Sequence, residues 1–420
     1  MELTAHERDL LSGGHGEGVR LAMEVLVKMG ELYGARRLLP VKSAHIDAAA
    51  YTTIWDAGTE FVEYLADHGA RVAVPTTINP LSRDVRAWRE IGASEGFAEK
   101  SARIEQAYLK MGVTPTWTCA PYQATNVPRF GEAVAWSESN AVDFVNSVVG
   151  ARAERLPDLF DVCCAVTGRV PEYGLYLDEN RAGDVLFRLE GFDGSWFSDS
   201  VDYAVLGYLV GERVVNRVPV IEGLPARTMP DDLKALSAAA ASGGAVALFH
   251  AGGHTPEAPT VEAAFRGREG YETVTVMPAD MRAMRERLDT AAGTVAHHVV
   301  VGCPHASFDE LRQVAELLGD RHVAQGTRLW IMTCDTQWQL ARRAGVADAL
   351  ERAGATVTCD TCLMELDEGD GRFAGETFVT NSGKVAQYAP GINGVTIKMA
   401  TLAGCVEAAV TGAFPKEAAR

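Results

Sequence analysis

The feature that most constrains the fold is a local pattern that recurs along the whole chain. A short run of β-forming residues ends in a polar or thiol-bearing tip, and a helical pattern soon follows. This alternation is typical of α/β layers with mainly parallel sheets, in which ligands gather at the carboxyl ends of the strands. The eight runs lie at residues 37–47, 71–80, 114–123, 245–258, 297–307, 328–337, 355–362 and 376–384. Their eight tips are therefore candidates for one site.

The sequence also indicates a division into two halves. Segment 212–230 carries three prolines, which is typical of a linker between domains. We expect an N-terminal α/β half over residues 1–215, which contains the motifs SAHID, PTTIN, TCAPY and SESNA. A C-terminal α/β half over residues 216–420 contains GCPHAS, DTC and TNSGK.

Charge and hydropathy exclude several classes of function. The formal net charge is −17 at pH 7 and the positive residues are scattered, whereas nucleic-acid binding needs a basic face. No apolar run reaches the roughly 18 residues of a membrane span, and the charged start MELTAHERDLL does not resemble a signal peptide. We expect a cytoplasmic enzyme of a small metabolite, without nucleic-acid or membrane partners.

Three of the cysteines stand where chemistry is expected. Cys119, Cys303 and Cys362 each end a strand-like run, so three thiolates from distant tips could converge on one centre. Thiolate donors suit iron–sulfur clusters, zinc or copper, and three protein ligands would leave one metal position open to a substrate. Cys359 and Cys362 also form a CxxC pair, which could instead be redox-active or half of a zinc site.

The stretch HHVVVGCPHASFDEL, residues 297–311, predicts a buried strand, a tight turn and a helix start. Ser307 and Glu310 have the spacing of a helix capping box. Gly302 would let the turn pass close to a bulky group. Cys303, at the strand tip, is open to three interpretations: a metal ligand, a nucleophile or a small core residue. His305 is either a partner of the metal ligands or a simple turn residue.

Polar side chains near the other tips suit a small polar substrate. The helix pattern in residues 137–155 is rich in Asn and Ser, whereas a solvated face prefers Lys and Glu, so a ligand-facing role is favoured. Lys384 lies at a strand tip and could bind a carboxylate or a phosphate. The substrate-binding candidates are Thr76, Thr77, Asn79, Pro80, Ser139, Asn140, Asn146, Ser147, Arg152, Asp178 and Ser382.

Taken together, these motifs resemble a known family. SAHID, VPTTINP, TCAPYQ, PRFGEAVAWSESNAV, NSVVGAR, GLYLDENR, GCPHAS, DTC and TNSGK occur in the order that is found in the catalytic large subunit of aconitase X enzymes, over residues 40–390. The resemblance implies an aconitase-like fold and a hydro-lyase with an iron–sulfur cluster held by Cys119, Cys303 and Cys362. Three cysteines serve 2Fe–2S, 3Fe–4S and 4Fe–4S clusters alike. A separate small subunit, a swivelling β-barrel domain, is implied as partner.

The resemblance also implies the reaction, which is dehydration of a small hydroxy acid. Family activities are dehydration of cis-3-hydroxy-L-proline, which we favour, and of mevalonate 5-phosphate. A phosphate would need several cations, and only Arg152, Arg181 and Lys384 are obvious. The candidates for the base that removes the proton are Ser43, His45, Glu138 and Lys384. A zinc or redox protein built on the CxxC pair, without dehydratase activity, is the alternative from another class.

Overall fold

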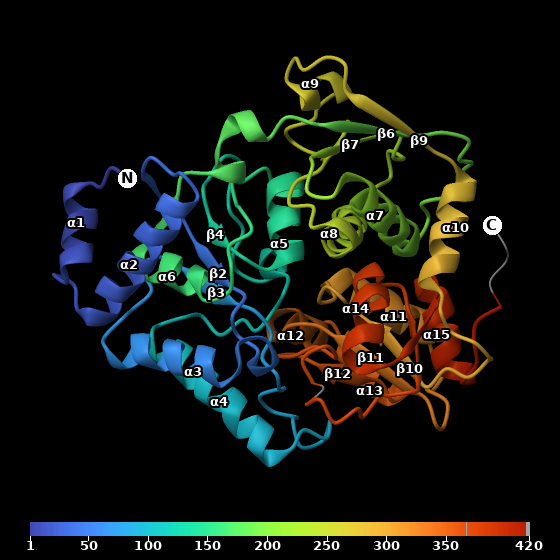
Figure 1. The fold of residues 1–420 in the computed structure, drawn as a ribbon. Helices are drawn as coiled ribbons and strands as arrows, with labels where there is room; N and C mark the ends of the chain where they lie inside the picture. The colour runs from blue at the N-terminus through green and yellow to red at the C-terminus, as the bar shows by residue number, and fades with distance from the viewer. Residues whose placement is uncertain (367, 417–420) are drawn as a thin grey trace.

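The computed structural model describes residues 1–366 and 368–416. Its elements form three consecutive groups, each built on its own parallel sheet, and Figure 1 shows them as a blue to green, a green to yellow and an orange to red region. The predicted α/β class with mainly parallel sheets is confirmed.

The first group has a three-stranded parallel sheet in the order β3-β2-β4 and an antiparallel pair, β1-β5. Pro40 ends β1, so the run 37–47 forms two strands that join different sheets. The elements are α1 (Ala5–Ser12), α2 (Glu17–Leu32), β1 (Leu38–Pro40), β2 (Ala44–Ile46), α3 (Tyr51–Asp67), β3 (Thr76–Ile78), α4 (Glu95–Lys110), η1 (Pro121–Gln123), β4 (Ala135–Trp136), α5 (Ser139–Phe144), the π-helix η2 (Val145–Val149), α6 (Phe160–Thr167), β5 (Arg169–Pro171), η3 (Gly174–Tyr176) and η4 (Asp178–Asn180).

The second group has a four-stranded parallel sheet in the order β8-β7-β6-β9. In Figure 1 its helices α7 and α8 lie between this sheet and the third group. The elements are β6 (Val185–Leu189), α7 (Ser200–Val214), β7 (Pro219–Glu222), α8 (Pro230–Gly244), β8 (His250–Ala251), α9 (Val261–Phe265), β9 (Glu272–Val276) and α10 (Pro278–Leu288).

The third group has a five-stranded parallel sheet in the order β12-β11-β10-β13-β14. Parallel strands need crossover connections, and helices supply them here except between β12 and β13, where the described residues form no helix. The elements are β10 (His298–Val301), α11 (Phe308–Leu318), β11 (Arg328–Met332), α12 (Asp335–Arg343), α13 (Val346–Ala353), β12 (Thr356–Thr358), β13 (Thr377–Thr380), α14 (Gly383–Asn393), β14 (Thr396–Met399) and α15 (Leu402–Thr411).

One hydrophobic core joins the second and third groups. It contains Phe187 of β6, Leu206 of α7, Trp330 of β11 and Phe378 of β13. Helix α7 is buried on nearly all sides, as expected for a helix that is apolar all round and lies inside a protein. Within the described residues, no helix is both long enough and apolar enough to cross a membrane.

Two expectations about local structure were wrong. Run 114–123 forms no strand, although it lies beside β3: Pro115 has no N–H to donate, the Thr116 hydroxyl takes the place of a backbone acceptor for Ile78, and Trp117 has a φ of 40°.

Segment 212–230 is not a linker, because it contains the buried strand β7. Its prolines stand at positions that tolerate proline, including the start of β7 and the first turn of α8. The expected division at residue 215 falls inside the second group, and the two halves stay a prediction.

Candidate active site

A cavity of about 380 Å³ lies where the first and third groups meet. Eight of the predicted site residues line it: Asn79, Pro80, Cys119, Glu138, Ser139, Cys303, Cys362 and Lys384. Most follow the carboxyl end of a strand, as Asn79 follows β3, Glu138 follows β4 and Cys303 follows β10. The cavity therefore receives strand tips from two different sheets.

The three predicted thiols line this one cavity. Burial raises the pKa of Cys119, Cys303 and Cys362, and an ionised Cys303 would raise the pKa of both Cys119 and Cys362 further. No three His, Cys, Asp or Glu side chains within residues 1–366 and 368–416 are placed to hold a single metal ion. The thiols therefore share a cavity without converging on one point.

The turn that carries Cys303 has the predicted form. Ser307 and Glu310 make the capping box of α11. Gly302 has a φ of 88°, and a Cβ there would lie 2.1 Å from the carbonyl oxygen of Met332 in β11. Close approach to the neighbouring strand is thus enough to require a glycine at this position.

An ion pair crosses the cavity between the first and third groups. The Lys384 Nζ lies 2.5 Å from the Glu138 Oε1, and both side chains are largely buried. Glu138 is the N-cap of α5 and accepts the backbone N–H of Ala141 at 2.8 Å. Burial lowers the pKa of Lys384, but the negative charges of Glu138 and of nearby thiolates outweigh burial and hold it well above its usual value. Lys384 is therefore a cation at neutral pH.

Two more carboxyl groups line the cavity. Asp47 follows β2 and accepts from the Asn79 amide, and Glu365 accepts from the Thr52 hydroxyl. Burial raises the pKa of both. Within the described residues neither carboxylate forms an ion pair, and Lys384 is the one lysine or arginine that lines the cavity. Sequence reasoning missed Glu365, although its place three residues after Cys362 was a usable signal.

The other predicted residues near β2 and β3 lie behind the cavity wall. The His45 ring is buried and contacts the Thr77 Oγ1 and the Asn79 Oδ1, each at 2.9 Å, so it orients Asn79 rather than reaching the cavity. Burial lowers the pKa of His45 to about 4. The Thr76 hydroxyl donates to the Val74 carbonyl at 2.8 Å. The Ser43 hydroxyl is buried without a hydrogen-bond partner in the described part of the chain.

Two predicted residues touch the cysteine segments without lining the cavity. The Asn140 amide donates to the Cys119 carbonyl at 3.1 Å. Ser382 is the N-cap of α14, and its contact lowers the pKa of Cys303, although burial remains the dominant effect and raises it. Both residues therefore support the thiols from outside the cavity.

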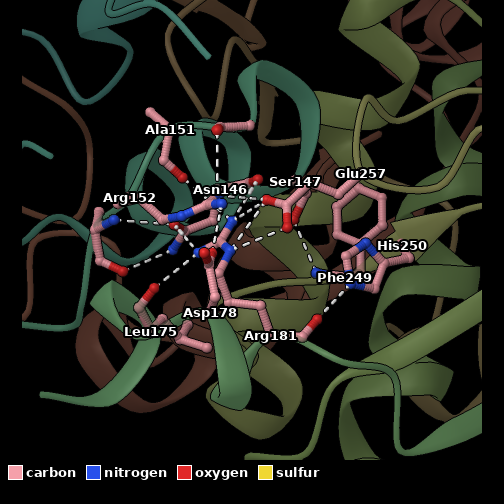
Figure 2. Close-up of polar contacts among 12 residues, drawn as sticks. Asn146, Ser147, Ala151, Arg152, Leu175, Asp178, Arg181, Phe249, His250 and Glu257 are labelled. Atoms are coloured by element: carbon pink, nitrogen blue, oxygen red, sulfur yellow. Dashed lines mark hydrogen bonds and ion pairs between the residues drawn. The ribbon is translucent and has the colours of Figure 1, made fainter. Parts of the chain in front are cut away.

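Four predicted residues belong to a different place, a network shown in Figure 2 that is buried at its centre and has Asp178 at its exposed edge. Asn146, Ser147, Arg152 and Asp178 surround the ion pair between Arg181 and Glu257, and do not line the cavity. The Arg152 guanidinium donates to Glu257 and to Asp178, each at 2.8 Å. The Ser147 hydroxyl accepts the Phe249 N–H at 2.8 Å. This network joins the first group to the second, and a role of these residues in substrate binding stays a prediction.

Comparison with known proteins gives the family. The models of the first, second and third aconitase X domains match residues 1–179, 183–286 and 296–411. A cis-3-hydroxy-L-proline dehydratase of Pseudomonas aeruginosa is 43% identical over 98% of this chain and 70% of its own length. A phosphomevalonate dehydratase large subunit of Methanothermobacter thermautotrophicus is 40% identical over 93% of this chain and 94% of its own length.

A solved structure agrees with these relatives. The holo-form crystal structure of Thermococcus kodakaraensis aconitase X superposes with a TM-score of 0.86 at 35% identity, over 97% of this chain and 100% of that one. Both relatives are dehydratases, which are carbon–oxygen hydro-lyases, so the predicted enzyme class is confirmed at the level of the family. Three matched domains, two relatives that match nearly the whole chain and one shared fold show that this chain belongs to the aconitase X family.

Proposed function

We propose that this chain is the large subunit of an iron–sulfur-dependent dehydratase and that its substrate is cis-3-hydroxy-L-proline. The observation that carries the choice of substrate is the charge of the cavity. Among the described residues, Asp47 and Glu365 face the cavity without forming an ion pair, and Lys384, the one lysine or arginine in its lining, is already paired with Glu138. An amino acid offers a cationic amine to these two carboxyl groups, and its positive charge would oppose the burial that raises their pKa values.

Mevalonate 5-phosphate, the runner-up, fits this cavity less well. It carries a phosphate and a carboxylate, and a phosphate is bound by several cations or backbone donors. Arg152 and Arg181, the other obvious cations in the sequence, are engaged in the network around Glu257 and do not line the cavity. The cavity thus favours a zwitterion over a polyanion.

The thiols suit the implied cluster. Burial raises the pKa values of these thiols, and a bound cation would favour their thiolate forms. A cluster contains several iron atoms, so each thiolate could bind a different iron, and the three thiols need not meet at one point. Cys119, Cys303 and Cys362 would hold the cluster. When bound, it would supply Lewis-acid activation of the substrate hydroxyl.

The chain's own residues would do the remaining work. Of the four candidates for the base, only Glu138 and Lys384 line the cavity. Lys384 is cationic, so we assign it to the substrate carboxylate, and we assign Glu138 to accept the proton from the carbon next to the departing hydroxyl. Asn79 and Ser139 line the same cavity and would orient the substrate by hydrogen bonds.

We also propose a small subunit that closes the cavity. The archaeal relative is named a large subunit, and 30% of the length of the Pseudomonas relative lies outside its match to this chain. Ile392 lines the cavity and is 50% exposed, which leaves an apolar contact open at the mouth. A swivelling β-barrel is the expected fold of this partner, and a cytoplasmic location stays a prediction.

The test is turnover by protein purified without oxygen together with its small subunit. We expect cis-3-hydroxy-L-proline to be consumed, and mevalonate 5-phosphate to be left unchanged. Loss of iron-dependent visible absorption in Cys362→Ala but not in the matched control Cys359→Ala would support the cluster ligands. A colourless zinc protein that depends on Cys359 would contradict them, and turnover of the phosphate alone would reverse the choice of substrate.

A further inference from the structure

His305 is the residue at which the three cysteine-bearing segments are tied together. It lies two residues after Cys303 and is 1% exposed. Its backbone N–H donates to the Cys119 Sγ at 3.3 Å. Its ring contacts the residues that precede the other two cysteines, through Nδ1 to the Thr118 Oγ1 at 3.1 Å and through Nε2 to the Thr361 carbonyl oxygen at 3.3 Å.

The partners fix the tautomer of the ring. A carbonyl oxygen can only accept, so Nε2 carries the hydrogen and donates it to Thr361. In the neutral ring Nδ1 then accepts, and the Thr118 hydroxyl is its donor. The Thr118 hydroxyl can give its hydrogen to Nδ1, because in its bond with the Ala120 N–H at 3.1 Å it acts as the acceptor and uses only a lone pair. The two ring contacts are therefore compatible with each other and with one protonation state.

His305 also lies where all three family domains meet. Thr118 belongs to the first domain, and Thr361 belongs to the third domain, as His305 itself does. From the second domain, the Lys234 Nζ approaches the His305 carbonyl oxygen at 3.4 Å. Lys234 is buried and paired with Glu310, the capping residue of α11. All four hydrogen-bonding atoms of His305 are thus engaged by four different residues.

We propose that His305 is a positioning residue that sets the placement of Cys119 and Cys362 relative to Cys303. This inference rests on the proposed function only where it concerns the cluster. The placement itself is a property of the metal-free chain, because each contact is made between groups of the protein. The three cysteines come from two domains, so contacts between these domains are needed to fix the cysteines relative to one another.

Three variants separate the contacts. His305→Ala removes both ring contacts and keeps the backbone ones. His305→Gln can place an amide donor near the Nε2 position and so keep the Thr361 contact, whereas His305→Asn places a polar atom near Nδ1 and keeps the Thr118 contact. Ser307→Ala is the matched control, because it removes the N-cap of α11 in the same turn, at a cost of about 1 kcal/mol, and touches neither threonine.

The measurement is the alkylation rate of each cysteine in the full-length, metal-free chain without oxygen, read by mass spectrometry. We expect His305→Ala to raise the rates at Cys119 and Cys362 at least fivefold. The Gln variant should protect Cys362 and the Asn variant Cys119. Buried Cys163 serves as an internal control for unfolding, and Ser307→Ala should change none of these rates more than twofold.

Two results would overturn the proposal: rates within twofold of the parent in all three variants, or Cys163 becoming reactive in step with the others in the Gln and Asn variants. If His305→Ala does not fold, the Gln and Asn variants decide, because their expected patterns are opposite. After reconstitution with iron and sulfide, the visible circular dichroism of these two variants should differ from the parent and from Ser307→Ala. A parent chain that takes up no iron would refute the cluster ligands of the proposed function, and the alkylation rates would still judge His305.

Discussion

Replacing Arg181 by methionine should destabilise the protein strongly, because this guanidinium is the centre of the network in Figure 2. Arg181 is 0% exposed and forms an ion pair with Glu257, which is also buried. Its nitrogens also donate to the carbonyl oxygens of Leu175 at 3.0 Å and of Asn146 and Ala151 at 3.2 Å. Methionine fills a similar length but donates to none of these acceptors.

The magnitude follows from the lost partners. Each buried acceptor without a donor costs about 1–3 kcal/mol, and breaking a buried ion pair costs about 3–5 kcal/mol. Arg152 and Arg266 still contact Glu257 in the variant, so its charge is not left alone. We therefore expect a loss of about 3–5 kcal/mol rather than the full sum, which is a large fraction of the roughly 5–15 kcal/mol typical of a folded domain.

The assay is urea unfolding followed by tryptophan fluorescence, with hydrogen exchange over residues 146–151 as a local measurement. Arg266→Met is the matched control, because Arg266 pairs with the same carboxylate but is 31% exposed, and it should cost below about 1 kcal/mol. Equal losses in the two variants, or a loss below about 1 kcal/mol for Arg181→Met, would refute the reasoning from burial.

Three further predictions concern the site. Glu138→Gln should lower kcat by about 10²–10⁴-fold in steady-state kinetics with little change in substrate binding, and a rate within fivefold of the parent would exclude Glu138 as the base. His45 stays neutral in the folded protein down to a pKa of about 4, whereas the unfolded chain takes up this proton near pH 6.5. The free energy of unfolding should therefore fall by about 3 kcal/mol as the pH drops from 6.5 to 4. The His45→Gln variant should lack this loss, and a pH profile of unfolding identical to that of the parent would contradict the prediction. Gly302→Ala should destabilise by at least about 1–3 kcal/mol in thermal unfolding, because its Cβ would meet the Met332 carbonyl oxygen at 2.1 Å in a left-handed conformation; an unchanged transition would show that the turn can move.

The sequence predicted best where the signals were local. In residues 297–311 the strand, the glycine turn and the capping box were each marked by neighbouring residues, and the structure has all three. Cys119 lines the cavity although it does not end a strand, and its role as a ligand stays a prediction. The segment before Cys119 forms no strand, because its hydrogen bonds with β3 are irregular. Two backbone bonds, from the Thr114 N–H to the Thr76 carbonyl and from the Thr118 N–H to the Ile78 carbonyl, still hold this segment along β3 as far as the cavity.

The sequence could not predict partners that lie far apart along the chain. The Asn and Arg residues of 146–152 have helical spacing and polar character, which suited a ligand-facing helix. Their partners are Arg181 and Glu257, about thirty to one hundred residues away, and nothing in the spacing reveals that pairing. The same holds for Glu138 and Lys384, whose nearness depends on how two sheets are placed against each other. Residue types were informative, but the assignment to cavity or core came from tertiary contacts.

The division of the site between two domains has a consequence for its energetics. Cys119 lies in the first domain, whereas Cys303 and Cys362 lie in the third. Any group that binds all three thiols also joins these domains, so its binding free energy stabilises the interface by linkage. The interface in turn affects binding. Contacts that hold the two domains together without metal, such as the hydrogen bond from the Leu81 N–H to the Asp360 carbonyl at 2.9 Å, reduce the entropy that is lost when a bound group fixes the domains in place. Residues in the interface can therefore alter the affinity for the proposed cluster without touching it, and if the chain binds that cluster, their variants should change iron retention and domain stability together.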